Sequence, residues 1–298
     1  MYREFWGMAA RPFTASHSPE WFVPVASAML ALTKIRYAIA ADAGVCAVVG
    51  AAGVGKSELT RLAVNDFAGN GWATAYLGNP AGPRDEFFGL LLRELDGRRG
   101  DANSPLEALT AHITEIAAAG GKILLALDDL HNLTDAAILD DLRMLLNIEQ
   151  RGQAAISLLL SGQAPLWGKL AAASEFDARV AMRVNLLPFS EAECETYMLQ
   201  RLKKSGCRRG VFSKKAAQTV AQASGGYAGN INRLCELSLV TAFALGQEKI
   251  RPEIVGAAAR DLAMPEDAYQ MRVYDEVWGN YAAPEKFTAP EEDILATV

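Results

Sequence analysis

The eight residues Gly50–Ser57, which read Gly-Ala-Ala-Gly-Val-Gly-Lys-Ser, constrain this chain more than any other feature. They match the pattern G-x-x-x-x-G-K-[ST] in full, directly after the apolar run Val45–Val49 and at the start of a helical pattern. In such a loop, glycines let backbone N–H groups curl around phosphate oxygens, and the helix adds the positive end of its dipole. The pattern predicts a phosphate-binding turn between a buried strand and a helix.

Individual positions of this loop have expected roles. Lys56 is expected to neutralise the charge of the β- and γ-phosphates and Ser57 to coordinate Mg²⁺. The predicted cofactors are therefore ATP and Mg²⁺. The residues expected to contact the nucleotide are Gly50, Ala51, Ala52, Gly53, Val54, Gly55, Lys56, Ser57 and Glu58.

A second motif, two consecutive aspartates, follows the apolar run Ile123–Leu127. A buried parallel strand delivers the residues at its carboxyl end to the edge of the sheet where ligands bind. We expect Asp128 to orient Mg²⁺, usually through water, and Asp129 to polarise the attacking water.

Two further candidates follow later strands. Gln163 ends the next predicted strand, and its side chain is expected to reach the γ-phosphate or the attacking water, unless it is a solvated loop glutamine. Arg179 and Arg183 are expected just before the last strand. In a ring or filament, an arginine there can enter a neighbour's site and stabilise developing charge; the alternative is a surface salt bridge. The predicted catalytic set is Lys56, Asp129, Gln163 and Arg179.

The order of the apolar segments predicts the architecture. Strands are expected over 45–49, 72–77, 123–127, 155–160 and 184–187, alternating with helices over 26–41, 56–67, 87–95, 105–119 and 138–148. This alternation is typical of an α/β fold with a doubly wound parallel sheet. After Pro188 only helices are expected, over 191–204, 214–223, 230–245 and 252–262. We therefore expect an α/β domain over 1–188 with an N-terminal extension over 1–45, a helical domain over 189–263 and a tail over 264–298.

The net charge lies in that tail. The chain of 298 residues is 51% hydrophobic and 21% charged, which excludes a disordered polymer, a fibre and a small disulfide scaffold. Residues 264–298 hold eight acidic and two basic residues, which account for the whole net charge of −6. Among the acids lie Tyr269, Tyr274, Trp278, Tyr281 and Phe287. This composition favours docking of the tail on the chain's own helical domain or on a neighbour's.

Cysteine use and hydropathy indicate the compartment. The four cysteines form no C-x-x-C pair and, with three histidines, no zinc-ligand spacing, so buried or idle thiols are expected. The N-terminus lacks a basic region followed by an apolar core, and no apolar run approaches about 18 residues. These observations predict a soluble cytoplasmic protein without a membrane span.

Taken together, the motifs resemble the ExeA/GspA-like branch of the AAA+ ATPases over roughly residues 1–262. The segments that carry the likeness are Phe5–Gly7, Arg11–Phe13, Gly50–Ser57, Asp128–Asp129, Arg143–Asn147, Leu158–Leu166, Arg179–Arg183, Leu187–Ser190 and Asn230–Cys235. The resemblance implies an αβα ATPase core with a small all-helical lid, ATP bound between them, and nucleotide-dependent assembly into a ring or filament. It also implies a switch or motor that acts on a macromolecular partner.

Two positions depart from that family. Asp129 stands where the family usually has Glu, and Gly229 stands where its lid motif usually has Arg. The shorter carboxylate holds water less closely, so hydrolysis is expected to be slow. The alternative to a motor is therefore a nucleotide-gated scaffold that binds ATP and scarcely hydrolyses it.

A third function class follows from local charge. Transposition ATPases of the TnsC/TniB kind share the AAA+ core and form ATP-dependent filaments on DNA. A basic stretch of this chain could contact phosphates in the same way, although a solvated lid face is the alternative. The DNA-contact candidates are Arg201, Lys203, Lys204, Arg208, Arg209, Lys214 and Lys215. A metabolic kinase also uses a phosphate loop, but the separate helical domain and the candidate Arg179 speak against it.

Overall fold

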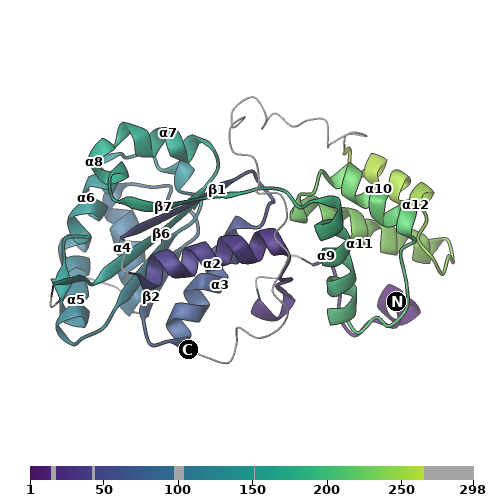
Figure 1. The fold of residues 1–298 in the computed structure, drawn as a ribbon, viewed down its shortest axis with the longest axis horizontal. Helices are drawn as coiled ribbons and strands as arrows, with labels where there is room; N and C mark the ends of the chain where they lie inside the picture. The colour runs from purple at the N-terminus through teal and green to yellow at the C-terminus, as the bar shows by residue number, and fades with distance from the viewer. Residues whose placement is uncertain (15–17, 42–43, 97–103, 151, 265–298) are drawn as a thin grey trace. The chain divides into compact units, whose positions relative to one another are not determined.

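The computed structural model describes residues 1–14, 18–41, 44–96, 104–150 and 152–264. By their contacts these residues divide into two compact units, one formed by the described residues within 18–22 and 30–187 and the other by those within 1–14, 23–29 and 188–264 (Figure 1). The acidic, aromatic segment 265–298, for which docking is expected, lies outside the described residues.

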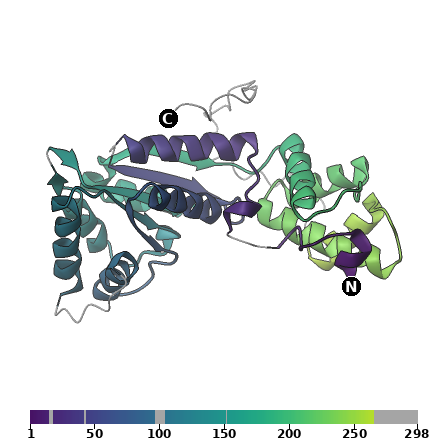
Figure 2. The same ribbon diagram turned by 90° about the horizontal axis from the view of Figure 1, so that it is seen from below.

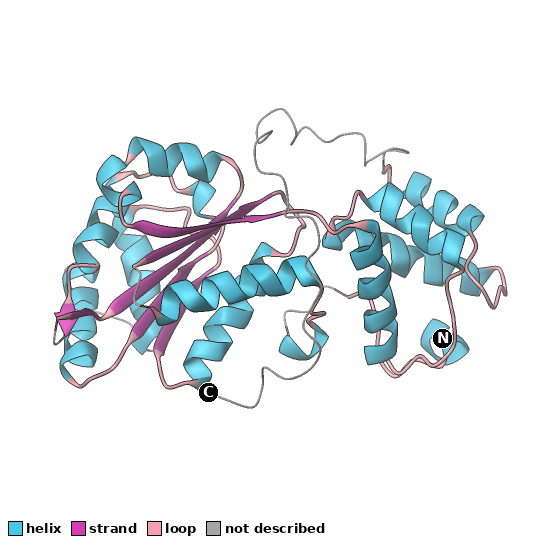
Figure 3. Ribbon diagram, in the orientation of Figure 1, coloured by secondary structure: helices cyan, strands magenta, loops and turns pink. Residues whose placement is uncertain are grey.

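The first unit is built on a five-stranded sheet in which every pair of neighbours is parallel (Figure 3). Its strands are β1 (Val45–Gly50), β2 (Ala73–Leu77), β3 (Ile123–Leu127), β6 (Ile156–Gly162) and β7 (Val180–Leu186), in the spatial order β2-β3-β6-β1-β7. β1, β3 and β6 are buried along their whole length, as expected for parallel strands covered on both faces. The predicted α/β fold with a parallel sheet is confirmed.

Helices flank this sheet. They are α2 (Ala26–Ala40), α3 (Lys56–Gly69), α4 (Arg84–Asp96), α5 (Pro105–Ala118), α6 (Ala137–Leu145), α7 (Pro165–Ala172) and α8 (Ser174–Asp177). Two single-turn helices, η1 (Pro19–Trp21) and η2 (Leu130–Asn132), and a short hairpin of β4 (Glu149–Gln150) and β5 (Gln153–Ala154) complete the unit. Figure 2 shows α2 running alongside the sheet, where Ser157 Oγ of β6 donates to the Ile39 carbonyl at 3.4 Å.

The last strand of the sheet is longer than predicted. It was expected over 184–187, but β7 begins at Val180. Alternate residues of its first half are exposed, so the continuous apolar run by which a buried strand is found is missing there. Arg183 therefore lies within the strand rather than before it. Its guanidinium stands 5.0 Å from the Trp167 ring centroid and donates to Asp177 at 2.6 Å.

The second unit is helical. Its elements are α1 (Tyr2–Trp6), α9 (Glu191–Lys204), α10 (Lys214–Ser224), α11 (Ala228–Ala244) and α12 (Pro252–Asp261). The start of α9 is set by a reciprocal capping box, in which Ser190 and Glu193 each bond the other's backbone N–H. Among the described residues of this unit, the strand-like pairing is a single bridge between Phe212 and Ile250.

The first residues of the chain belong to this helical unit, although they were expected to extend the α/β domain. Apolar burial explains the placement. Trp6 is 1% exposed and its indole N–H donates to the Leu239 carbonyl of α11 at 3.2 Å. Phe13, also buried, meets Phe212 edge-on at 6.4 Å between ring centroids.

All four cysteines are buried, with Cys46 in the α/β unit and Cys194, Cys207 and Cys235 in the helical unit. Burial raises the pKa of Cys46 to about 12, and burial together with nearby Glu193 and Glu191 does the same for Cys194. Within the described part of the chain, no helix has both the length and the apolar character needed to cross a membrane.

Candidate nucleotide site

The phosphate loop connects β1 to α3 through a turn that only small residues allow. Gly50 ends β1, and a side chain there would place its Cβ 2.6 Å from the Leu186 carbonyl oxygen of β7. Gly53 and Gly55 have φ of 79° and 105°, a backbone region that favours glycine. Since α3 begins at Lys56, its free N-terminal amides face the hollow of the loop.

Lys56 is a buried cation with unused hydrogen-bonding capacity. It is 6% exposed, and its ammonium donates to the Ala51 carbonyl at 2.9 Å. Burial lowers its pKa, while Asp129 and Asp128 oppose that shift by favouring the charged form. An ammonium has three N–H donors, so an anionic ligand here would replace lost hydration and complete its coordination.

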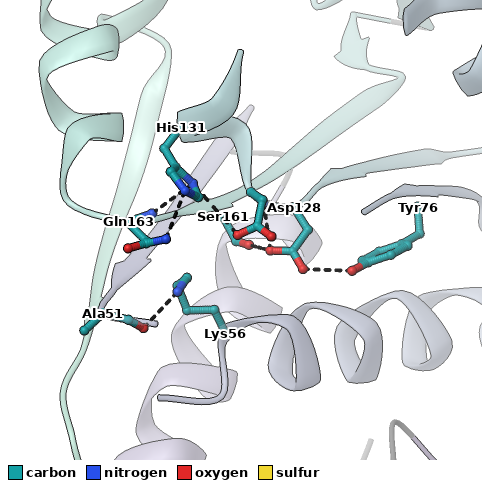
Figure 4. A network of polar contacts seen from close by, with 8 residues as sticks. Ala51, Lys56, Tyr76, Asp128, His131, Ser161 and Gln163 are labelled. Carbon is teal, nitrogen blue, oxygen red and sulfur yellow. Dashed lines mark hydrogen bonds and ion pairs between the residues drawn. The ribbon is translucent and has the colours of Figure 1, made fainter. Parts of the chain in front are cut away.

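Asp128 is held at the end of β3 by three donors (Figure 4). The residue is 1% exposed, and its backbone N–H donates to the Leu77 carbonyl of β2 at 2.8 Å. Tyr76 O–H donates to Oδ2 at 2.8 Å, whereas Ser161 O–H and the Asp129 N–H, the latter at 3.0 Å, donate to Oδ1. Neighbouring strands thus fix both carboxylate oxygens.

Asp129, the next residue, is less buried than Asp128. It has a positive φ of 53°, which is uncommon outside glycine, and its side chain is 41% exposed. His131, one turn further on, lies 3.8 Å from Asp129 Oδ1 through Nδ1. Gln163 contacts both nitrogens of the same ring, through its backbone N–H at 3.4 Å to Nδ1 and its side-chain amide at 3.0 Å to Nε2. His131 therefore lies between Gln163 and Asp129 and contacts both.

The residues present fit a magnesium–nucleotide complex. The glycine turn leaves room at the start of α3, and Lys56 supplies a buried, incompletely bonded cation. Ser57, the second residue of α3, and Asp128 offer oxygen ligands of the kind that Mg²⁺ prefers. The Asp129 side chain is 41% exposed, so its carboxylate can accept a hydrogen bond from a water molecule.

Arg179 lies at the amino-terminal end of the parallel strands, whereas the phosphate loop lies at their carboxyl-terminal end. β1 and β7 run parallel with Val45 opposite Val180, so Arg179 precedes the amino end of the strand whose carboxyl end forms the phosphate loop. Five residue steps along a strand separate the two edges by about 17 Å. The Arg179 guanidinium donates to Asn147 Oδ1 at 2.8 Å. The structure does not bring Arg179 to the phosphate loop of its own chain.

The structure removes one of the seven DNA-contact candidates. Arg201 was a candidate for DNA contact, but it is 1% exposed and its guanidinium donates to the Pro12 and Thr14 carbonyls, each at 2.6 Å. Its place on α9 faces the N-terminal segment, which covers it. Arg209 is exposed but donates to the Phe5 carbonyl and stands 5.0 Å from the Trp6 ring centroid. The remaining candidates, Lys203, Lys204, Arg208, Lys214 and Lys215, are exposed.

Three polar residues of the site were not predicted from sequence, and one of them is Ser161, which bonds the Asp128 carboxylate. Tyr76 is the penultimate residue of β2, and its pKa is raised by burial and by Asp128. His131 follows the aspartate pair by two residues, and that proximity was the one available signal for it. None of these residues belongs to a sequence motif with a known role.

Comparisons with known proteins identify sequences and structures to which this chain is similar. Residues 39–170 match the family model described as an AAA domain. The chain is 27% identical over 268 residues to General secretion pathway protein A of Aeromonas hydrophila, covering 88% of this chain and 49% of that protein. It thus spans about half the length of the curated relative that it matches.

Solved structures show the same fold. The Aeropyrum pernix ORC2 protein superposes with a TM-score of 0.66 at 19% identity, covering 84% of this chain and 71% of that one. Drosophila ORC bound to DNA gives a TM-score of 0.64 at 17% identity, covering 85% and 65% of the respective chains. At such identities the likeness concerns the fold alone. Residues 39–170 therefore form an AAA domain on a parallel sheet, and the chain as a whole is similar to General secretion pathway protein A.

Proposed function

We propose that this protein is a magnesium-dependent ATPase that assembles through its nucleotide site and acts as a switch or motor on a macromolecular partner. The observation that carries the proposal is the buried Lys56 ammonium beside Asp128 and Asp129, directly under a glycine loop. A cation buried with spare donors is a costly arrangement in a folded protein, and an anionic ligand offsets that cost.

In this proposal each residue has a distinct task. The amides of the loop and the Lys56 ammonium bind the β- and γ-phosphates, and Ser57 and Asp128 hold Mg²⁺, which supplies charge neutralisation when bound. Tyr76 and Ser161 keep the Asp128 carboxylate oriented. Asp129 accepts a proton from the attacking water or orients it, because its carboxylate is exposed and accessible.

His131 and Gln163 extend the proposed site. The contacts of His131 with Asp129 on one side and Gln163 on the other connect the base to the end of β6. We propose that Gln163 senses the γ-phosphate and that His131 is a positioning residue for Asp129. Slow turnover follows from Asp129, whose side chain is one methylene shorter than glutamate.

Arg179 is the proposed contribution of one protomer to its neighbour. Within its own chain it lies about 17 Å from the phosphate loop, by strand geometry, so it can serve catalysis only in another copy. Such a site is incomplete in a single molecule. Nucleotide binding and assembly are then coupled.

Mixing two inactive variants tests the proposal. Lys56→Ala is expected to abolish ATP binding and turnover, and Arg179→Ala to abolish turnover while ATP binding is retained. When the two are mixed, protomers that retain Lys56 meet neighbours that retain Arg179, so part of the turnover returns. Lys34→Ala, an exposed lysine of α2, is the control and should turn over normally. Retained turnover in Lys56→Ala would contradict the site assignment.

A DNA-binding regulator is the second candidate function. Five exposed basic residues of the helical unit support it: Lys203, Lys204, Arg208, Lys214 and Lys215. ATP-dependent binding to duplex DNA should then weaken steeply with salt, because phosphate contacts release counterions. Binding that is unaffected by salt would remove this candidate.

A further inference from the structure

The helical unit contains a groove that the nucleotide site does not explain. It has a volume of about 740 Å³ and lies between α9, the loop around Gly210 and the start of α10. Its floor is apolar and includes Met198, Leu202 and Val211, and Leu199 beside them is 59% exposed. A large aliphatic side chain exposed next to an apolar hollow is typical of a docking surface.

The rim of this groove is positively charged. It carries Lys203, Arg208, Arg209 and Lys214, against one acidic residue, Glu195. In the part of the chain that the structure describes, Lys203, Arg208 and Lys214 form no ion pair. An occupant with negative charge therefore meets cations that are not already neutralised.

The start of α10 adds to this positive potential. Lys214 and Lys215 are its first two residues, and its first turn contains no acidic residue. Helix starts favour negative groups because the dipole is positive there, so two lysines at this end are unfavourable unless an anion covers them. Ser213 caps the helix by accepting a hydrogen bond from the Ala216 N–H at 3.1 Å. This neutral cap does not compensate the two positive charges.

The chain itself supplies a complementary segment. Residues 265–298 contain eight acidic and two basic residues, with Tyr274, Trp278 and Tyr281 at spacings i, i+4 and i+7. That spacing is the pattern by which an amphipathic helix presents anchors to an apolar groove. The segment follows Met264, three residues after α12 ends at Asp261, and α12 packs against α10. Even as a helix, its 34 residues span about 50 Å, which is long enough to reach a neighbouring groove.

We propose that the acidic, aromatic segment 265–298 docks in this groove of its own chain, with aromatic side chains on the floor and carboxylates along the rim. The apolar floor favours such a peptide over a nucleic acid, because a phosphate backbone gains nothing from Met198, Leu199 and Leu202. The proposal is independent of ATP hydrolysis, since it concerns the helical unit and needs no nucleotide.

Carbodiimide cross-linking of the full chain tests the contact directly. This reagent joins a lysine amine to a carboxylate only where the two touch, and mass spectrometry identifies the joined peptides. Cross-links are expected from Lys203, Lys214 or Lys215 to acidic residues of 266–293. Their yield should fall as salt is raised, because exposed charges are screened within about 8 Å at physiological ionic strength.

A matched pair of variants separates docking from random encounter. Leu199→Glu places a negative charge on the groove and should reduce the cross-link yield about tenfold or more, because it removes apolar burial and repels the acids. Leu245→Glu is the control, since Leu245 is 63% exposed in the same unit and does not line the groove. Thermal melting checks that both variants are folded.

Isotope labelling decides which chain supplies the segment. In an equal mixture of ¹⁴N and ¹⁵N protein, cross-links within one isotopic chain that Leu199→Glu removes and Leu245→Glu leaves intact would support the proposal. Mixed-isotope cross-links would overturn it in favour of a second copy's segment. Absence of these cross-links, or equal yields in both variants, would also overturn it; a Leu199→Glu protein that has instead lost DNA binding would assign the groove to nucleic acid.

Discussion

Lys56 and Arg201 are two buried cations, one in each unit, and they differ in how their donors are used. Lys56 is 6% exposed and its ammonium has the Ala51 carbonyl as its hydrogen-bond acceptor in the described chain. Arg201 is 1% exposed and donates to the Pro12 and Thr14 carbonyls, beside the Tyr197 ring. Both residues belong to sequence patterns that suggest ligand contact.

The difference separates a binding group from a structural one. A buried cation whose donors are satisfied by carbonyls stabilises the fold and offers nothing to a ligand. A buried cation with spare donors destabilises the fold until an anion arrives. Burial alone therefore does not identify a site; the remaining hydrogen-bonding capacity does.

Replacing Lys56 with Met tests the first half of this contrast and has the largest expected effect. ATP turnover should fall by about 10³-fold or more, equivalent to about 4 kcal/mol, because the phosphate charge loses its partner. The free energy of unfolding without nucleotide should not decrease, because the substitution removes the cost of burying an ammonium. Phosphate release and chemical denaturation measure the two quantities.

The pH dependence of stability gives an independent check on Lys56. Because burial lowers its pKa in the folded state, the unfolded chain binds more protons between the folded and unfolded pKa values. The stability of the native protein should therefore rise with pH across that interval, relative to Lys56→Met. Identical pH profiles for the two proteins would mean that this ammonium is not desolvated.

Replacing Arg201 with Met tests the second half. The Pro12 and Thr14 carbonyls lose their donors, so the free energy of unfolding of the helical unit should fall by about 3 kcal/mol. Turnover per folded molecule should be unaffected if Arg201 is purely structural. Arg260→Met, an exposed arginine at the end of α12, is the control and should cost less than about 0.5 kcal/mol. Equal stabilities for the two variants would contradict the structural role.

Tyr76→Phe extends the contrast to the carboxylate next to Lys56. It removes one donor from Asp128 and keeps the ring, so we expect about a tenfold loss of magnesium affinity in ATP turnover, near 1.4 kcal/mol. The maximal rate at saturating Mg²⁺ should recover. A loss of rate that Mg²⁺ does not restore would point to damage beyond Asp128.

Glu193→Gln probes a half-buried carboxylate of the helical unit and has the smallest effect. Burial alone would raise the pKa of Glu193, but hydrogen bonds from Ser190 and Ser27 lower it below its ordinary 4.5. Its stabilisation, about 1 kcal/mol, is present above the unfolded pKa and lost as pH falls through the lower folded value. Native and variant stabilities should thus differ at pH 7 and converge in acid. A constant difference at all pH values would rule out the charge as its cause.

Much of the α/β unit was predictable because its strands are continuous apolar runs with clear breaks. The helix expected over 191–204 has the same bounds as α9, and the capping box of Ser190 and Glu193 in the structure explains where it begins. The segment 165–177 has no long run of apolar residues at helical spacing, and in the structure it forms two short helices. Strand order was not predictable, because it depends on crossover packing rather than on any local residue pattern.

The candidate site was predictable where nucleotide chemistry requires particular residues at a fixed spacing in the sequence. Lys56, Asp128 and Asp129 come together because the loop and the strand ends bring them to one edge of the sheet. Tyr76 and His131 could not be assigned, since their roles depend on which strand lies beside which. Arg201 was misassigned because a run of bases in sequence does not reveal that the N-terminal segment covers one of them.

The buried cysteines give this protein a native set of reporters for local opening. Cys46 reports on the α/β unit, whereas Cys194 and Cys235 report on the helical unit. Because their thiols are shielded and their pKa values raised, alkylation by a small reagent requires the surrounding unit to open transiently. Measuring the modification rate of each thiol with and without ATP would yield separate opening free energies for the two halves, with no engineered label.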